Sequence, residues 1–351
     1  MFTIEMFPAE HGDCLWIEYG DSSNPRKVLI DAGTEGSVQP LLDRIESLPK
    51  NKRHFELLVI THVDADHIGG ILELIDKADE LDVEFDDIWF NAWKHIRDPQ
   101  DDILGPVQGE MLSQKLSSGL PWNQKFNGKA IVVPDVGPLP VINITGGLKL
   151  TVLSPFREQL DRLRPVWKKV VEEAGLEPGV FKKIPKEEAE EDILGIDVEK
   201  LAKEKFKGDK AEANGSSIGL LAEHDGKTII LGADAYAPVL LKSLKLLSGE
   251  EKTKVDVFKL PHHGSRANIN TELLEKIVCK KFLVSTNGKI FKHPNQQAIA
   301  RIIKFGGKNP KLYFNYKTKF NQVWDSEGLM SKFGYKTFFP KAGKNGLRLS
   351  I

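Results

Sequence analysis

Four side chains that can bind a metal ion fall within six positions of this 351-residue chain. They are His62, Asp64, Asp66 and His67. The apolar run Phe55–Thr61 precedes them and predicts a buried strand, and a glycine pair and a helical pattern follow. Imidazole and carboxylate groups suit zinc, manganese or iron. A polar turn with solvated acids is the alternative, but four such groups are costly to bury unless a cation compensates them.

Three more predicted strands end in residues of similar chemistry. The residues are Asp234, His262, His263 and His293. Asp234 can serve as a ligand, or it can cap a helix that begins near Ala237. The adjacent histidines beside Gly264 favour a site over a packed or exposed pair, and His293 is open to either reading. If these strand ends meet in one cleft, the residues supply two metal sites.

The order of these motifs resembles the metallo-β-lactamase fold superfamily, and its nearest branch is the soluble hydrolase domain of the DNA-uptake protein ComEC with its stand-alone relatives. Smaller pieces also match that branch: His11-Gly-Asp13-Cys, Leu29–Gly33, Gly215–Ser217 and His293-Pro294. The resemblance runs from Met1 to about Ile303, apart from one charged stretch. It implies an α+β fold, a four-layer αβ/βα sandwich with the metals at one edge of the two sheets.

The resemblance also implies ligands for one or two zinc ions, with Mn²⁺ or Mg²⁺ as alternatives. These ligands are His62, Asp64, Asp66, His67, Asp234 and His262. The first two would bind one ion, the next two and His262 a second ion, and Asp234 would bridge both. His262 is preferred over His263 because it comes first after the strand, although the order of the pair can be reversed.

Two departures from the family pattern concern the first ion. Asp64 stands where the common motif has a second histidine, which makes that site harder and more tolerant of Mn²⁺ or Mg²⁺. A third histidine is expected just before Ser216 or Ser217, but the stretch Glu212–Gly215 contains none. The first site is then either weak or completed by His293 or by a water molecule.

The expected chemistry is hydrolysis by a metal-bound hydroxide. The catalytic residues of this interpretation are Asp66, His263 and His293, and either histidine could protonate the leaving group. Asp13 and Asp31 are expected to orient ligand histidines, or alternatively to cap turns.

The first predicted function is a phosphodiesterase or nuclease-type activity on nucleic acid or nucleotides, with Lys259, Lys289 and Lys292 placed to meet phosphates. The second is hydrolysis of a small-molecule ester, lactone, thioester or phosphocholine group, with Trp89–Trp93 and Trp122 lining a pocket or packing in the core. The third is a non-catalytic binding protein on the same fold. Salt-dependent binding to DNA would separate the first from the second.

Composition sets the remaining limits. With 49 basic and 50 acidic residues, the net charge is −1, so no overall basic field draws the chain to nucleic acid or membrane. The only cysteines, Cys14 and Cys279, lie in apolar surroundings and indicate a reducing compartment. We find no signal-peptide pattern and no long apolar run, and therefore expect a cytoplasmic protein.

We expect a single hydrolase domain over residues 1–351. Residues 156–212 are dense in lysine and glutamate and are interrupted by Pro165, Gly175, Pro178 and Pro185. They predict a charged helical insertion within that domain. This insertion is interpreted as a solvated charged face or as a cap over the active site.

Overall fold

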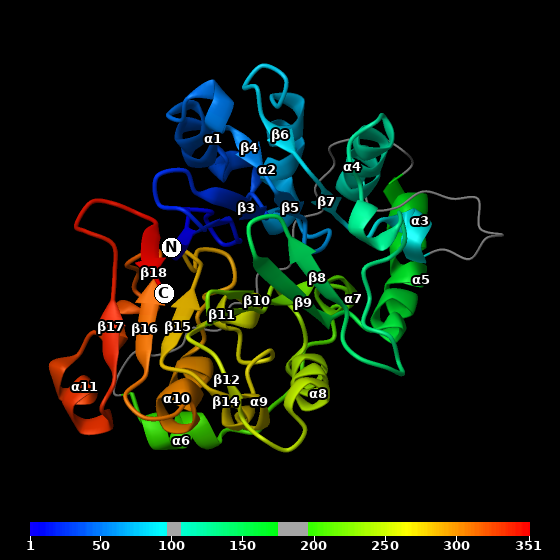
Figure 1. Ribbon diagram of the computed structural model, residues 1–351. Coiled ribbons are helices and arrows are strands. Elements are labelled where there is room, and N and C mark those ends of the chain that lie inside the picture. Colours follow the sequence, from blue (N-terminus) through cyan, green and yellow to red (C-terminus); the bar gives the residue numbers. More distant parts are fainter. Residues whose placement is uncertain (97–106, 175–195) are drawn as a thin grey trace.

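Two β-sheets pack against each other in the computed structural model, which describes residues 1–96, 107–174 and 196–351 (Figure 1). The six-stranded sheet has the order β18 (Leu347–Ser350), β1 (Phe2–Met6), β2 (Leu15–Tyr19), β3 (Arg26–Ile30), β5 (Leu57–Val59) and β7 (Ile88–Trp89). The eight-stranded sheet has the order β17 (Lys336–Phe338), β16 (Lys311–Phe314), β15 (Lys281–Val284), β13 (Val257–Lys259), β11 (Lys227–Leu231), β10 (Gly219–His224), β9 (Leu148–Ser154) and β8 (Val141–Ile144). Two small sheets pair β4 (His54–Phe55) with β6 (Glu84–Phe85), and β12 (Thr253–Lys254) with β14 (Ile277–Val278).

Helices cover the outer face of each sheet. In chain order they are α1 (Gln39–Glu46), α2 (Ala65–Asp76), α3 (Trp93–Ile96), α4 (Val107–Ser117), α5 (Arg157–Ala174), α6 (Val198–Lys203), α7 (Glu212–Gly215), α8 (Ala237–Ser248), α9 (Thr271–Lys276), α10 (Gln296–Phe305) and α11 (Glu327–Phe333). Helices α1 and α2 lie on the side of the six-stranded sheet, and α8, α9 and α10 lie on the side of the eight-stranded sheet (Figure 1). This arrangement is the four-layer αβ/βα sandwich that the family resemblance implied.

Strand β2 shows why four layers form. All five of its residues are buried, including Glu18, so both faces of the strand are covered. Ile17 belongs to the hydrophobic cluster that includes residues of both sheets, whereas Trp16 belongs to the cluster formed with α1 and α2. Because successive side chains point to opposite faces, each face of the strand has its own apolar partner layer.

The parallel strands of both sheets position the chemistry-bearing loops. Strands β3, β5 and β7 run parallel, as do β11, β13 and β15. The carboxyl ends of parallel strands meet at one edge of a sheet. The loops after β5, β11 and β13 carry His62, Asp234 and the His262–His263 pair, respectively. The expected convergence of strand ends is therefore present in the fold.

Hydrophobic periodicity predicted most strands of both sheets but not β8, β9 and β17, and one helix is shorter than expected. The pattern predicted a helix over 270–280, whereas α9 ends at Lys276. The next two residues, Ile277 and Val278, form β14 instead and pair with Thr253 and Lys254. Their β-branched side chains favour the extended conformation once a partner strand is available.

The predicted insertion over 156–212 contains α5 and α6, and its residues 175–195 lie outside the described part of the chain. Its described helices are partly buried. Leu160 and Trp167 of α5 belong to one hydrophobic cluster, and Val198 and Ala202 of α6 belong to the other. A wholly solvated charged face does not describe these helices. The insertion boundaries and the single-domain description remain predictions.

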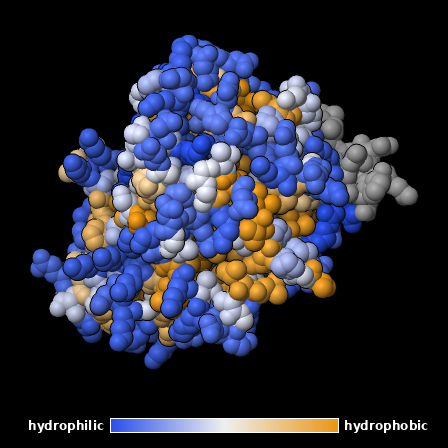
Figure 2. All heavy atoms as spheres, in the orientation of Figure 1, coloured by the Kyte–Doolittle hydropathy of each residue, from blue (hydrophilic) through white to orange (hydrophobic). Residues whose placement is uncertain are grey.

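Figure 2 shows a largely hydrophilic face with apolar residues gathered near its middle, around the β8–β9 hairpin and the segment before it. Val136 and Val141 are exposed there. Among the described residues, no helix combines the length and apolar character needed to cross a membrane.

Candidate metal centre

The loop after β5 leads directly into α2, and this transition orients the four clustered side chains. Asp64 occupies the N-cap position of α2, but its carboxylate caps no backbone amide. Asp66 and His67 lie in the first turn of the same helix. The loop and the first helical turn thus present these side chains at the edge where the two sheets meet.

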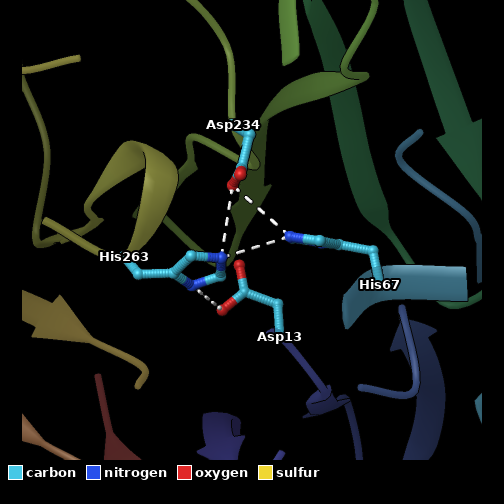
Figure 3. Close-up of side chains that lie close together, drawn as sticks. All are labelled: Asp13, His67, Asp234 and His263. Atoms are coloured by element: carbon cyan, nitrogen blue, oxygen red, sulfur yellow. Dashed lines mark hydrogen bonds and ion pairs between the residues drawn. The ribbon is translucent and has the colours of Figure 1, made fainter. Parts of the chain in front are cut away.

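One group of ligand atoms converges from three loops. Nε2 of His67 lies 3.3 Å from Nε2 of His263, and Oδ1 of Asp234 lies 3.5 Å and 3.7 Å from these two atoms (Figure 3). Oδ2 of Asp66 lies 3.5 Å from Nε2 of His263. Ligands on a tetrahedral ion with bonds of about 2.1 Å are about 3.4 Å apart. The observed spacings therefore fit a divalent metal ion.

Hydrogen bonds fix which nitrogen of each ring faces this group. Nδ1 of His67 lies 2.7 Å from Oδ2 of Asp31, and Nδ1 of His263 lies 2.9 Å from the carbonyl oxygen of Ser285. Both partners only accept, so each Nδ1 carries a proton and Nε2 is the nitrogen that faces the centre. Each Nε2 can bind a metal ion once it has lost its own proton. The predicted orienting role of Asp31 is consistent with this contact.

A second group of atoms lies on the other side of Asp234. Nε2 of His62 is buried without a hydrogen-bond partner, 3.6 Å from Oδ2 of Asp64 and 4.0 Å from Oδ2 of Asp234. Nε2 of His262 lies 3.8 Å from the same Asp234 oxygen. Asp234 thus presents one oxygen to each group, as expected for a bridging ligand.

The structure reverses the preferred order of the adjacent histidines. His263, rather than His262, faces Asp66 and His67, and its side chain is fully buried while that of His262 is 20% exposed. Both residues have left-handed backbone conformations, with φ of 46° and 53°. This conformation is uncommon for residues other than glycine, so the sequence rule that the first histidine after a strand is the ligand did not anticipate it.

The charges of the buried group are strongly coupled. Although burial opposes ionisation, the facing histidines hold the pKa of Asp66 and Asp234 below the ordinary value. Burial likewise opposes a charge on His263, but Asp234 and Asp13 raise its pKa to about 9. Without a cation, protons on the histidines balance the carboxylates. A divalent metal ion can take over that compensating role.

Lys259 does not reach a substrate, contrary to the sequence expectation. Its ammonium is fully buried and lies 2.6 Å from Oδ2 of Asp13. Oδ1 of Asp13 lies 3.5 Å from Nδ1 of His263, on the side of the ring that faces away from His67 (Figure 3). Asp13 completes a buried group of four possible ligands with His67, Asp234 and His263, but its pairing with Lys259 favours the predicted orienting role.

His293 lies beside His262, with the ring centroids 5.2 Å apart. Burial, reinforced by the two neighbouring histidines, keeps its pKa well below the usual 6.5. The ring is therefore neutral at pH 7 and has no imidazolium proton for a leaving group. The role of His293 as an acid stays a prediction that this environment does not favour.

The tryptophans predicted to line a pocket are core residues. Trp89, Trp93 and Trp122 are all buried. The indole N–H groups of two of them donate hydrogen bonds within the protein, that of Trp89 to Asp87 and that of Trp122 to the carbonyl of Phe90. The packing alternative is thus the one that the structure supports.

Three residues near His262 escaped the sequence analysis. Nδ1 of His262 lies 2.9 Å from Oδ1 of Asn268, 3.2 Å from Oδ2 of Asp209 and 3.3 Å from Nδ2 of Asn214. Asp209 belongs to the charged stretch 156–212, where acids are too common to stand out. Asn214 alone was indicated indirectly, because it lies in the stretch Glu212–Gly215 where the family pattern led us to expect a histidine.

Comparison with known proteins supports the fold. The family model described as the metallo-beta-lactamase superfamily matches residues 9–149. The chain has the fold of that superfamily, and the Asp/His group at its expected edge can hold a divalent metal ion. A search among curated proteins found no match. Nothing in these comparisons supports the ComEC-like branch.

Solved structures show distant similarity. The metallo-beta-lactamase fold protein YhfI from Bacillus subtilis is 12% identical, with 100% of both chains covered and a TM-score of 0.47. CmlA, a diiron beta-hydroxylase from Streptomyces venezuelae, is 11% identical, with a TM-score of 0.43; the match covers 100% of this chain and 54% of CmlA. The MIM-2 metallo-beta-lactamase is 13% identical, covers 72% of this chain and 74% of its own, and has a TM-score of 0.30. This chain spans about half the length of CmlA.

Proposed function

We propose that this protein is a metal-dependent hydrolase that cleaves phosphodiesters. One observation carries the proposal: the Nε2 atoms of His67 and His263 converge with carboxylate oxygens of Asp234 and Asp66 at 3.3–3.7 Å. Each ring is held by its other nitrogen, which is the usual support for a metal-binding histidine.

Bound divalent ions would supply Lewis acidity and lower the pKa of a coordinated water toward neutral pH. The role of the protein is to hold and orient. Asp66, His67, His263 and Asp234 form the inner ligand group, and Asp31 and the Ser285 carbonyl fix the two rings. Asp64, 41% exposed, is the most accessible of the candidate ligands, so a substrate would approach from its side.

Basic residues on the same loops favour an anionic substrate. Arg266 follows the His262–His263 loop and is exposed, and Lys289 is exposed on the loop that ends at His293. Lys292 is on that loop and is partly buried. Such side chains can contact phosphate oxygens without reading a sequence. The resemblance of the motifs to the ComEC-like branch points in the same direction. Hydrolysis of a small ester, lactone, thioester or phosphocholine group is the second candidate.

The decisive experiment compares substrates on metal-reconstituted protein. Chelator-treated protein would be loaded with Zn²⁺, Mn²⁺ or Mg²⁺ and offered bis(p-nitrophenyl) phosphate, single-stranded DNA, p-nitrophenyl acetate and a thioester. We expect metal-dependent cleavage of the phosphodiesters, lost in Asp66→Asn and kept in His54→Ala. His54 is a suitable control because it is half-exposed, lies in β4 and pairs with Asp86, whereas His62 follows β5.

The other possible results of this assay distinguish between the remaining candidate functions. Turnover of the acetate or thioester alone would move the function to the second candidate. Metal binding without turnover of any substrate would favour a binding protein on the same fold. If DNA is the substrate, its binding should weaken steeply as salt rises.

The buried free thiols Cys14 and Cys279 also suit a cytoplasmic location.

A further inference from the structure

The adjacent histidines His262 and His263 point to opposite sides of one carboxylate. Nε2 of His263 lies 3.7 Å from Oδ1 of Asp234, whereas Nε2 of His262 lies 3.8 Å from Oδ2. Their rings are nearly perpendicular, at 77°, and their centroids are 5.9 Å apart. Because both residues have a left-handed backbone conformation, their side chains point into two different ligand groups.

The group around Oδ2 of Asp234 has one imidazole from His62 and one carboxylate from Asp64. The Thr61 hydroxyl donates to Asp31, so it accepts a hydrogen bond from Nδ1 of His62, 3.0 Å away. Because Nδ1 carries the proton, Nε2 of His62 keeps a free lone pair. A buried nitrogen with a free lone pair and no partner is costly unless something occupies the space that it faces. His262 faces the same oxygen of Asp234.

Hydrogen bonds also fix the orientation of His262. The amide of Asn268 donates to the carbonyl oxygens of Asp234 and Ala235, so Oδ1 of Asn268 is turned toward Nδ1 of His262. Asp209 offers a second acceptor, at 3.2 Å. The Asn214 amide, 3.3 Å from Nδ1, donates to Asp209 at 2.7 Å, so the two closest neighbours of Nδ1 are acceptors. Nδ1 therefore carries a proton, and Nε2 is the nitrogen turned toward Asp234.

Asp209 is itself held rigidly. Its backbone amide donates to the carbonyl of Ala267, and its Oδ1 accepts from the amide of Ala211. Its Oδ2 accepts from Asn214 at 2.7 Å and from Asn268 at 3.0 Å. The stretch that lacks the family's third histidine thus contributes Asn214, which supports the carboxylate beside His262.

We infer that His262, oriented by Asn268 and Asp209, completes a second metal position with His62, Asp64 and Oδ2 of Asp234. In this arrangement the two adjacent histidines serve different ions that share Asp234. The inference rests on the proposed metal-dependent function and adds the identity of the missing imidazole. It replaces the sequence-based expectation that His293 or a water molecule fills that role.

The test is metal stoichiometry, measured by elemental analysis of dialysed protein and by calorimetric titration of metal-free protein with Zn²⁺ and Mn²⁺. The variants are His262→Asn and His263→Asn, since asparagine tolerates the left-handed backbone better than alanine does. His54→Ala is the control for loss of a histidine. Circular dichroism and thermal melting would confirm that each variant is folded.

We expect wild-type protein and His54→Ala to bind two ions, and His262→Asn to bind one with unchanged affinity for the ion that remains. His263→Asn should lose the other ion. Asp209→Asn should keep both, with one affinity weakened about 10- to 100-fold, as when an outer partner of a ligand histidine is lost. Asp209→Glu should recover part of that loss.

If His262→Asn holds as many ions as wild-type protein, with the same affinities, the inference is overturned, whereas a single-ion hydrolase would still stand. A wild-type protein that binds no divalent metal would instead refute the proposed function itself. Should His262→Asn not fold, the Asp209→Asn titration decides: two unchanged affinities count against the inference.

Discussion

Lys259 and Asp13 form an ion pair in the interior, with Nζ and Oδ2 2.6 Å apart and side chains only 0% and 1% exposed. Asp13 follows β1 of the six-stranded sheet, and Lys259 ends β13 of the eight-stranded sheet. The pair therefore joins the two sheets beneath the candidate metal centre. Asp13 in turn contacts His263 with its other oxygen, at 3.5 Å.

Replacing Lys259 with methionine should destabilise the fold. Methionine retains most of the apolar stem but leaves Asp13 as an uncompensated buried charge, which costs about 3–5 kcal/mol. Urea denaturation monitored by circular dichroism would measure the loss in the free energy of unfolding. The double variant Asp13→Asn/Lys259→Met removes both charges and should recover most of it. A loss below about 1 kcal/mol in the single variant would contradict the role of the pair.

Asp66→Ala should abolish hydrolysis while leaving a folded protein. The substitution removes a carboxylate 3.5 Å from Nε2 of His263. Loss of an outer partner alone costs about 10- to 100-fold in metal affinity, so we expect at least about 100-fold for an inner ligand. Metal content and initial rates would be compared with those of wild-type protein, and circular dichroism would report folding. Full activity in this variant would remove Asp66 from the site.

Gly12→Ala should disturb the candidate metal centre by displacing the first turn of α2. A Cβ atom on Gly12 would lie 1.6 Å from the backbone carbonyl oxygen of Asp66, so the first turn of α2 would have to move. We expect weaker metal binding together with a lower melting temperature. Gly36→Ala is the matched control, because a Cβ atom there meets nothing within 4 Å. Equal behaviour of the two variants would show that the close approach of the Gly12 loop is unimportant.

The protein should lose stability as the pH falls below neutrality, partly through His95. Burial, assisted by the charge of Lys94, lowers the pKa of His95 from 6.5 to about 4. Its Nδ1 also accepts a hydrogen bond from the Ala92 amide, which a protonated ring could not do. The stabilising contribution is complete above pH 6.5 and is lost progressively toward pH 4.

The size of this effect is roughly 2 kcal/mol by pH 5. Denaturant titrations at pH 7 and pH 5 on wild-type protein and His95→Gln would measure it. The variant has no ionisable ring at this position, so the difference in stability between the two pH values should shrink. An unchanged difference would assign the acid sensitivity to other groups.

The sequence was informative where periodicity or ligand spacing governs the structure. The run from His62 to His67 was correctly placed between an apolar strand and a helix, and its metal-binding chemistry stays a prediction. The apolar strands predicted the six-stranded sheet to within a few residues and five strands of the eight-stranded one, but not β8, β9 and β17. These patterns depend on local backbone geometry and on burial, which a single sequence records directly.

The sequence could not reveal the contacts that depend on backbone direction and distant partners. Nothing in the residue types at 262 and 263 specifies two left-handed conformations, so their order in the site was reversed. Lys259 was assigned to phosphate because lysines are usually solvated, whereas Asp13, 246 residues away, makes its burial possible. Asp209 lies 53 residues from its partner His262, among many other acids.

Unequal exposure of the ligands that flank Asp234 has a kinetic consequence. On the side of Oδ2, Asp64 is 41% and His262 20% exposed, although His62 is buried. On the side of Oδ1, His67 and His263 have no exposed side-chain surface and Asp66 is 13% exposed. If two ions bind as proposed, the ion on the Oδ2 side, the outer position, would have the shorter route to solvent. A brief treatment with chelator should therefore strip the outer position first, and a different metal added afterwards would yield a protein with two unlike ions.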